Sequence, residues 1–185
     1  MRLFVGLGLP PDVRMRLGAL AGGLEGARWV QPESLHLTLR FIGEVDGGEA
    51  EDLAAALADI AAPAFDMRLD GLGYFGTARK IRLLWAGVRD GAQADEGLRH
   101  LQAKVEAAAV RSGFGDEGRK FKPHVTIARF RRAAPKSLGV YLESHGGFST
   151  PAFPVLQFTL FESRMGHGGS HYIPLSEYSL TERAA

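Results

Sequence analysis

The chain has 185 residues, of which 45% are hydrophobic and 23% are charged, and its formal net charge is +1. This composition is that of a folded globular protein and excludes general disorder. The absence of cysteine excludes a disulfide framework, a thiolate nucleophile and a cysteine-ligated zinc site. No apolar stretch approaches the roughly 20 residues that span a bilayer, so we expect a cytoplasmic protein with no membrane partner.

The N-terminal part of the sequence predicts strand, helix, strand and helix in that order. Apolar residues alternate with glycine over residues 3–9, which is typical of a strand. Pro10-Pro11-Asp12 then predicts a helix start, and the helix's apolar stripe is formed by Val13, Leu17, Leu20 and Leu24. A second strand covers residues 35–41. Asp46 and Glu49 have the spacing of a capping box, which predicts that the next helix begins there.

The rest of the chain predicts five further strands and one helix. Strands are expected over residues 65–72 and 81–88, with a glycine-rich turn between them. Asp90 and Gln93 suggest a helix cap, and the helix's apolar stripe is formed by Leu98, Leu101, Val105 and Ala108. A basic strand follows over residues 123–130, then a loop-rich stretch to Thr150. Two last strands, over 155–161 and 172–180, flank a glycine-rich loop that contains His167.

One short pattern occurs twice. His36-Leu37-Thr38-Leu39 and His124-Val125-Thr126-Ile127 both read histidine, apolar, threonine, apolar, and their histidines are 88 residues apart (124 − 36). Side chains alternate across a strand, so each motif presents its histidine and threonine on one face. Each motif also ends a strand-helix-strand unit, over residues 3–42 and 81–130, which indicates a weak internal duplication. Duplicated halves that pack about a pseudo-two-fold axis would bring both motifs into one groove.

Such a constellation suits displacement at phosphorus. Histidine exists in both protonation states near neutral pH, so one ring can accept a proton from water while the other donates one to a leaving oxygen. Thr38 and Thr126 can donate hydrogen bonds to the non-bridging oxygens, and an arginine can balance their charge. Residues 119–136 are rich in lysine and arginine and contain no acidic residue. They suit a phosphate-bearing substrate, or form a solvated strand end with its loop.

Ordinary alternatives exist for these residues. A single histidine-apolar-threonine strand is common and is usually structural, so only the presence of a second copy indicates a catalytic role. Metal ligation is the other alternative. Zinc normally takes at least three protein ligands, and no Asp, Glu or Cys stands at a plausible spacing beside His36 or His124. We therefore expect no metal and no cofactor, and we assign His100 to a helix surface and His145 to a loop.

The sequence resembles the two-histidine phosphoesterases, specifically the bacterial and archaeal RNA 2′,3′-cyclic phosphodiesterases, also called the 2′-5′ RNA ligase family. The similarity extends along nearly the whole chain. The segments that carry it are residues 2–4, 9–10, 28–30, 36–45, 84–88, 121–129 and 163–172. One departure is His167, where the family often has proline, which leaves the conformation of that loop open.

The resemblance implies a single bilobal α+β domain over residues 1–185, with two pseudo-symmetric strand-helix-strand lobes around a central groove. It also implies metal-independent hydrolysis of RNA 2′,3′-cyclic phosphate ends to 2′-phosphates, with His36 as the proton donor and His124 as the acceptor. The partner would be such an RNA end, with tRNA fragments as one candidate, and the protein a monomer. Three alternatives stay open: 2′-5′ joining of RNA ends, hydrolysis of a small cyclic phosphate, and a non-catalytic RNA-binding module.

The arginines and aromatics near the motifs are not equivalent. Arg40 lies four residues after His36 and shares its face on an undistorted strand, whereas Arg129 lies five residues after His124 and would point away. The family pattern nevertheless favours Arg129 as the phosphate contact, so we expect a bulge or a strand end near Ala128. Phe4 and Tyr172 are candidates to stack on a base or ribose, or they are ordinary core aromatics.

Overall fold

The computed structural model describes residues 1–77, 80–89, 92–131, 135–166 and 169–182. The helices are α1 (Pro11–Gly18), α2 (Gly47–Ala58), α3 (Ala92–Arg111) and α4 (Leu138–Ser144), with a short 3₁₀ helix η1 (Pro32–Ser34). The strands are β1 (Arg2–Gly8), β2 (Ala27–Trp29), β3 (His36–Glu44), β4 (Phe65–Met67), β5 (Leu69–Thr77), β6 (Lys80–Val88), β7 (His124–Phe130), β8 (Phe153–Val155), β9 (Gln157–Gly166) and β10 (Gly169–Ser179). No helix among these residues is long and apolar enough to cross a membrane.

An antiparallel eight-stranded sheet runs through both halves of the molecule. Its order is β10-β9-β1-β3-β7-β6-β5, and β2 pairs with β7 beside this path. The predicted recurrence of strand, helix and motif strand is present as β1-α1-β3 and β6-α3-β7, with β2 and η1 standing between α1 and β3 in the first unit. The two motif strands, β3 and β7, are neighbours at the centre of the sheet, where Leu37 is paired with Val125. The strands β4 and β8 form a separate two-stranded sheet.

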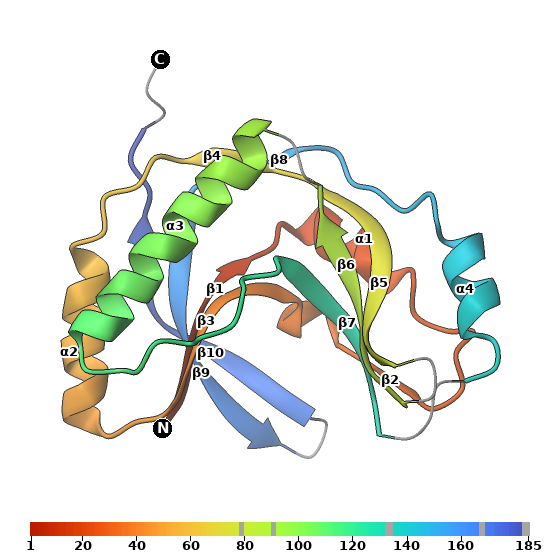
Figure 1. Ribbon diagram of the computed structural model, residues 1–185, viewed down its shortest axis with the longest axis horizontal. Coiled ribbons are helices and arrows are strands. Elements are labelled where there is room, and N and C mark those ends of the chain that lie inside the picture. Colours follow the sequence, from red (N-terminus) through yellow and green to blue (C-terminus); the bar gives the residue numbers. More distant parts are fainter. Residues whose placement is uncertain (78–79, 90–91, 132–134, 167–168, 183–185) are drawn as a thin grey trace.

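The core lies on one face of this sheet. Leu37 and Leu39 in β3, and Val125 and Ile127 in β7, are buried in a core that both halves of the chain share. The histidine and threonine of each motif alternate with these residues and are only partly buried. In Figure 1, α2 and α3 lie beside the β1–β3 half and α4 beside the β5–β6–β7 half, and the sheet bends between them. We call the sheet face that bears the histidines and threonines the groove face.

The helix predictions were confirmed in part. The Asp46 carboxylate accepts a hydrogen bond from the Glu49 amide at 2.9 Å, and the Glu49 carboxylate accepts one from the Asp46 amide at 2.9 Å. This capping box starts α2 as predicted. Helix α1 is shorter than its apolar stripe, because it ends at Gly18. Leu20 and Leu24 are still buried, but the turns after the helix carry them.

Two predicted elements differ from the structure. Residues 65–72, expected to be one strand, form β4 and the beginning of β5, which belong to different sheets. The stretch before Thr150, expected to be loop-rich, contains α4, whose Leu138 and Tyr141 are buried. Their spacing of three is helical, but the glycines around them concealed the pattern. Two further sequence features, the cap residue Asp90 and His167 in the last hairpin, lie outside the described residues.

Candidate active site

Each motif histidine is the first residue of its strand, and the backbone just before it fixes its ring. His36 begins β3 and its Nδ1 donates to the Ser34 carbonyl oxygen at 2.8 Å. His124 begins β7 and its Nδ1 donates to the Lys122 carbonyl oxygen at 2.6 Å. A carbonyl only accepts, so the proton of each neutral ring is on Nδ1. Both rings therefore keep Nε2 free for proton transfer, because each Nδ1 donates to the carbonyl two residues earlier in the chain.

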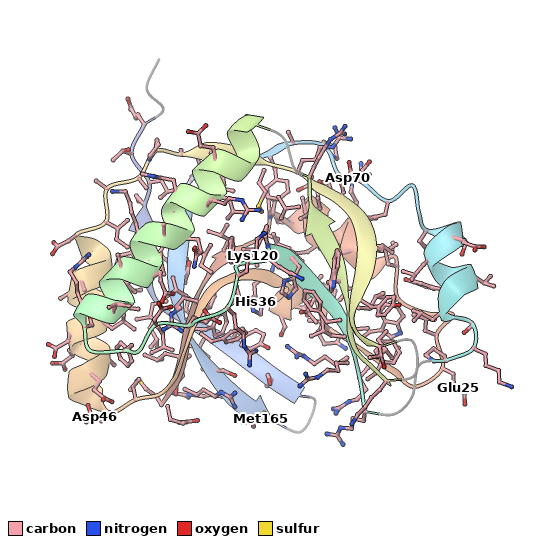
Figure 2. All side chains as sticks on the ribbon, in the orientation of Figure 1. Glu25, His36, Asp46, Asp70, Lys120 and Met165 are labelled. Carbon is pink, nitrogen blue, oxygen red and sulfur yellow. The ribbon has the colours of Figure 1, made fainter. Side chains whose placement is uncertain are left out.

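The two motifs lie side by side. Because β3 and β7 are antiparallel and Leu37 pairs with Val125, the next positions along the strands set His36 across from Thr126 and Thr38 across from His124. Figure 2 shows His36 near the middle of the molecule, where the two arms of the sheet meet. Thr38 and Thr126 are partly buried residues, and neither hydroxyl has a hydrogen-bond partner among the described residues. They remain available to a ligand.

Aromatic rings enclose each imidazole. The ring of His36 lies 4.7 Å from that of Phe4 and 4.6 Å from that of Tyr172, centroid to centroid. The ring of His124 lies 4.9 Å from that of Phe75 and 6.4 Å from that of Trp85. A neutral imidazole packs well against such walls, whereas an imidazolium loses water there without gaining a counter-ion. The walls thus fix both rings and disfavour their charged forms.

The electrostatics follow from this enclosure. The pKa of His36 is lowered to about 4. Burial is the largest cause, the Ser34 carbonyl opposes it, and the positive charges of Arg129 and His124 add to the lowering. Burial also lowers the pKa of His124, and Arg129 adds to that effect. Both rings are therefore mainly neutral in the free protein at neutral pH. Arg129 influences both histidines, so an anion bound near it would favour the imidazolium form of either one.

A hollow of about 490 Å³ opens beside His36. Its lining includes Gly8, Ser34, His36, Thr159, Phe161 and Tyr172. His124 is not among the lining residues, so the hollow belongs to the β1–β3–β9–β10 half of the groove face. It provides space for a ligand that reaches His36 from the side away from His124.

A bulge in β7 brings Arg129 to the groove face. Trp85 pairs with Thr126 and Leu84 with Ala128, so Ile127 is an extra residue on β7. Ile127 and Ala128 are both buried, and Arg129 emerges exposed on the side of His124 and Thr126. The predicted bulge near Ala128 is confirmed, and it removes the objection that Arg129 would point away.

The same irregularity in β3 turns Arg40 away from the groove face. Gly6 pairs with Thr38 and Val5 with Arg40, so Leu39 is the extra residue here. The prediction that Arg40 shares the face of His36 is wrong, because it assumed an undistorted strand.

Arg40 is instead a buried structural residue, 6% exposed. Its Nε lies 2.7 Å from a Glu106 carboxylate oxygen and its Nη1 lies 3.5 Å from a Glu117 carboxylate oxygen. The guanidinium also donates to the carbonyls of Phe41, at 2.8 Å, and Gly115. These contacts hold the guanidinium in the core, away from the groove face, so Arg40 is not placed to contact a substrate phosphate.

Of the two aromatic candidates, only Tyr172 is placed to meet a ligand. Phe4 is 3% exposed and its ring stacks on Phe161 at 5.0 Å, so it backs His36 and offers no open face for a base. Tyr172 is partly buried, contacts His36 by an edge and lines the hollow. The alternative that Phe4 is a core aromatic is thus the one that the structure supports.

A family model described as "LigT like Phosphoesterase" matches residues 7–85 and 91–172 of the chain. The chain belongs to the LigT-like phosphoesterase family. The RNA 2′,3′-cyclic phosphodiesterase of Escherichia coli K12 is 32% identical to it over 98% of this chain and 97% of the relative.

Solved structures agree with this membership. A Thermus thermophilus protein superposes with a TM-score of 0.80 at 30% identity over 100% of both chains. E. coli LigT complexed with 3′-AMP superposes with a TM-score of 0.77 at 29% identity over 98% of both. These matches confirm the expected α+β fold of the two-histidine phosphoesterases.

Some residues of this LigT-like site were missed by the motif argument. Phe75 and Trp85 come from the β5–β6 hairpin, and Gly73 makes room for the indole, since a β-carbon there would lie 2.3 Å from it. Phe41 is 56% exposed and pairs with Phe4, which places it on the groove face. Strand alternation from His36 predicts the opposite face for Phe41. Only the position of the bulge would have revealed it.

Within the described residues, no group of three His, Asp or Glu side chains is arranged to hold a metal ion. Metal-free chemistry in this family member therefore stays a prediction, which a chelator can test.

Proposed function

We propose that this LigT-like phosphoesterase hydrolyses the 2′,3′-cyclic phosphate at an RNA end and leaves a 2′-phosphate. The observation that carries the proposal is the pair of histidines, each holding its Nδ1 proton on a main-chain carbonyl and keeping Nε2 free, beside one exposed arginine. The E. coli relative's name, RNA 2′,3′-cyclic phosphodiesterase, supports the choice of substrate.

The reaction needs one proton acceptor and one donor. Nε2 of neutral His124 accepts a proton from water, and the water oxygen attacks phosphorus in line with the 3′ oxygen. The bond between phosphorus and the 3′ oxygen breaks, and protonated His36 donates its Nε2 proton to that oxygen. The products are a 2′-phosphate and a free 3′-hydroxyl. The pair ends with its proton on His124 and regains its starting state by exchange with solvent.

The lowered pKa of His36 suits the donor. Burial keeps the ring neutral until a phosphate anion arrives, and the anion then favours its protonated form. Because burial favours the neutral ring, the protonated ring has a proton to give as negative charge develops on the departing oxygen.

Charge on the phosphate is balanced by groups from both motifs. The hydroxyls of Thr38 and Thr126 donate to the two non-bridging oxygens, and Arg129 supplies the positive charge. This role for Arg129 is supported by its charge, which lowers the pKa of both histidines.

The test uses an oligonucleotide that ends in a 2′,3′-cyclic phosphate, with the product isomer identified after hydrolysis. We expect His36→Ala and His124→Ala each to reduce kcat by roughly 10²–10⁴-fold, which is the usual contribution of a positioned acid or base. EDTA should leave the wild-type rate unchanged. Near-wild-type turnover in either folded variant would contradict the proposal.

A second substrate separates the two roles. A phosphodiester with a p-nitrophenolate leaving group needs no proton donor. His36→Ala should therefore regain much of its activity on it, whereas His124→Ala should not. Recovery in His124→Ala but not in His36→Ala would mean that His124 is the donor and His36 the acceptor. No recovery in either variant would argue against a donor and acceptor pair.

A further inference from the structure

A second exposed arginine stands next to Arg129. In the pairing of β2 with β7, Arg28 lies directly opposite Arg129, and Trp29 lies opposite Ala128. Directly opposed residues of an antiparallel pair project to the same side of the sheet. Both Arg28 and Arg129 are exposed. The two guanidinium groups therefore share one side of the sheet.

That side is the groove face. Ala128 is fully buried and Trp29 packs on the core, with its ring 6.1 Å from that of Tyr141. Arg28 precedes Trp29 along the strand, so it projects to the other face, where His124 and Thr126 lie. Figure 2 shows nitrogen-tipped side chains gathered between the β9–β10 hairpin and β7.

The arginine pair has an unbalanced charge. Like charges directly opposite each other on paired strands repel and destabilise the pair. Three other arginines have carboxylate partners: Arg40 has Glu106 and Glu117, Arg89 has Asp70, and Arg164 has Glu162. Within the described part of the chain, neither Arg28 nor Arg129 forms an ion pair or a side-chain hydrogen bond. A bound polyanion would relieve this repulsion.

We propose that Arg28 binds the phosphodiester group one nucleotide before the cyclic phosphate. This inference rests on the proposed function, in which Arg129 meets the cyclic phosphate itself. Arg28 lies on the neighbouring strand, on the side of Arg129 away from β6, and an RNA chain that leaves the site there places its next phosphate beside it. The site then favours an RNA end over a cyclic mononucleotide, because only the RNA end has this second phosphate.

The test compares two substrates in Arg28→Gln. The quantity compared is kcat/KM for a short oligonucleotide with a cyclic phosphate end, divided by kcat/KM for a 2′,3′-cyclic mononucleotide. We expect this ratio to fall about tenfold, because the variant loses a charge-assisted contact at an exposed site. Arg111→Gln is the matched control, since it removes the same charge from the exposed end of α3. Its ratio should equal that of the wild type.

A neutral methylphosphonate in place of the adjacent phosphodiester identifies the group that Arg28 contacts. With the methylphosphonate oligonucleotide, the wild-type ratio of the two kcat/KM values should fall to the ratio that Arg28→Gln shows with the normal oligonucleotide. The ratio of Arg28→Gln itself should not fall further. A ratio that is unchanged in Arg28→Gln, or lowered equally by Arg111→Gln, would overturn the inference.

Failure of the proposed function would be a different result, in which the wild type hydrolyses neither substrate. The inference is then decided by binding of an oligonucleotide that ends in a 2′-phosphate. Weaker binding and a smaller salt dependence in Arg28→Gln than in Arg111→Gln would support it. Equal binding by the two variants would overturn it.

Discussion

At the scale of single residues, His36 serves the site at a cost to the fold. Its ring is held among Phe4, Tyr172 and the Ser34 carbonyl, and this burial lowers its pKa from 6.5 to about 4. The unfolded chain therefore binds a proton at His36 more tightly than the folded protein does. Stability must then rise with pH through this interval, and it is lost as the pH falls from about 6.5 toward 4.

The predicted consequence is an acid-sensitive fold that a substitution at His36 makes less sensitive. The lowered pKa corresponds to at most about 3 kcal/mol lost on acidification. His36→Gln has no titrating ring, so its free energy of unfolding should fall less between pH 7 and pH 4.5 than that of the wild type. Urea unfolding at the two pH values measures this. His124→Gln provides a comparison, since the pKa of His124 is lowered in the same direction. Equal losses in wild type and His36→Gln would refute the argument.

At the scale of elements, two bulges decide which side chains reach the groove face. In each motif strand the extra residue follows the threonine, at Leu39 in β3 and at Ile127 in β7. The fourth residue after each histidine is thereby sent to the core and the fifth to the groove face. The core therefore receives Arg40 and Ala128, and the groove face receives Phe41 and Arg129.

Sequence reasoning found one of these bulges and missed the other. The bulge near Ala128 was expected because a charged residue that the family pattern assigns to phosphate otherwise faced the core. Nothing comparable marked β3, where simple alternation gave Arg40 an acceptable position beside His36. Its true partners, Glu106 and Glu117, lie more than 60 residues away in sequence, and local patterns carry no information about such contacts.

The same limit explains the other differences in the fold. The capping box at Asp46 was predictable because both of its hydrogen bonds are local. The break between β4 and β5 was not, because it depends on the strands that each one pairs with: Phe65 pairs with Val155, and Leu69 pairs with Val88. The motif strands themselves were predictable, since alternation and burial agree over their first four residues.

A prediction at the element scale concerns the buried contacts of Arg40. Arg40→Met leaves the carboxylates of Glu106 and Glu117 partly buried without their cation, which should cost about 3–5 kcal/mol in the free energy of unfolding. Burial already raises the pKa of Glu117, so this carboxyl should become protonated more readily in the variant. Urea unfolding measures the loss, and the double variant Arg40→Met/Glu106→Gln should recover part of it. A loss below about 1 kcal/mol, or no recovery, would contradict this role.

At the scale of the whole molecule, the site exists only because the two halves meet. His36 and Thr38 come from the first strand-helix-strand unit, and His124, Thr126 and Arg129 from the second. The antiparallel contact of β3 with β7 brings the units together at the centre of the sheet. The charge of His124 is one of the causes that lower the pKa of His36, so the protonation of one ring affects the other.

The last prediction concerns the pH dependence of catalysis by this pair. The proposed mechanism needs one neutral and one protonated histidine, so both kcat/KM and kcat should rise and then fall with pH. The kcat/KM profile reports the free protein, in which burial and Arg129 lower both pKa values, so its maximum should lie below about 6.5. The kcat profile reports the complex, where the bound phosphate anion favours the imidazolium, so its maximum should lie at higher pH.

Steady-state rates on the oligonucleotide, measured over the range in which circular dichroism shows the protein to be folded, give both profiles. Arg129→Gln removes a cation that lowers both pKa values, so its kcat/KM maximum should move to higher pH even though its rate falls. A rate that increases steadily to pH 9 would exclude a protonated donor. A kcat maximum below that of kcat/KM would show that the bound phosphate does not stabilise the imidazolium, and His36 could not then be charged in the way that the mechanism requires.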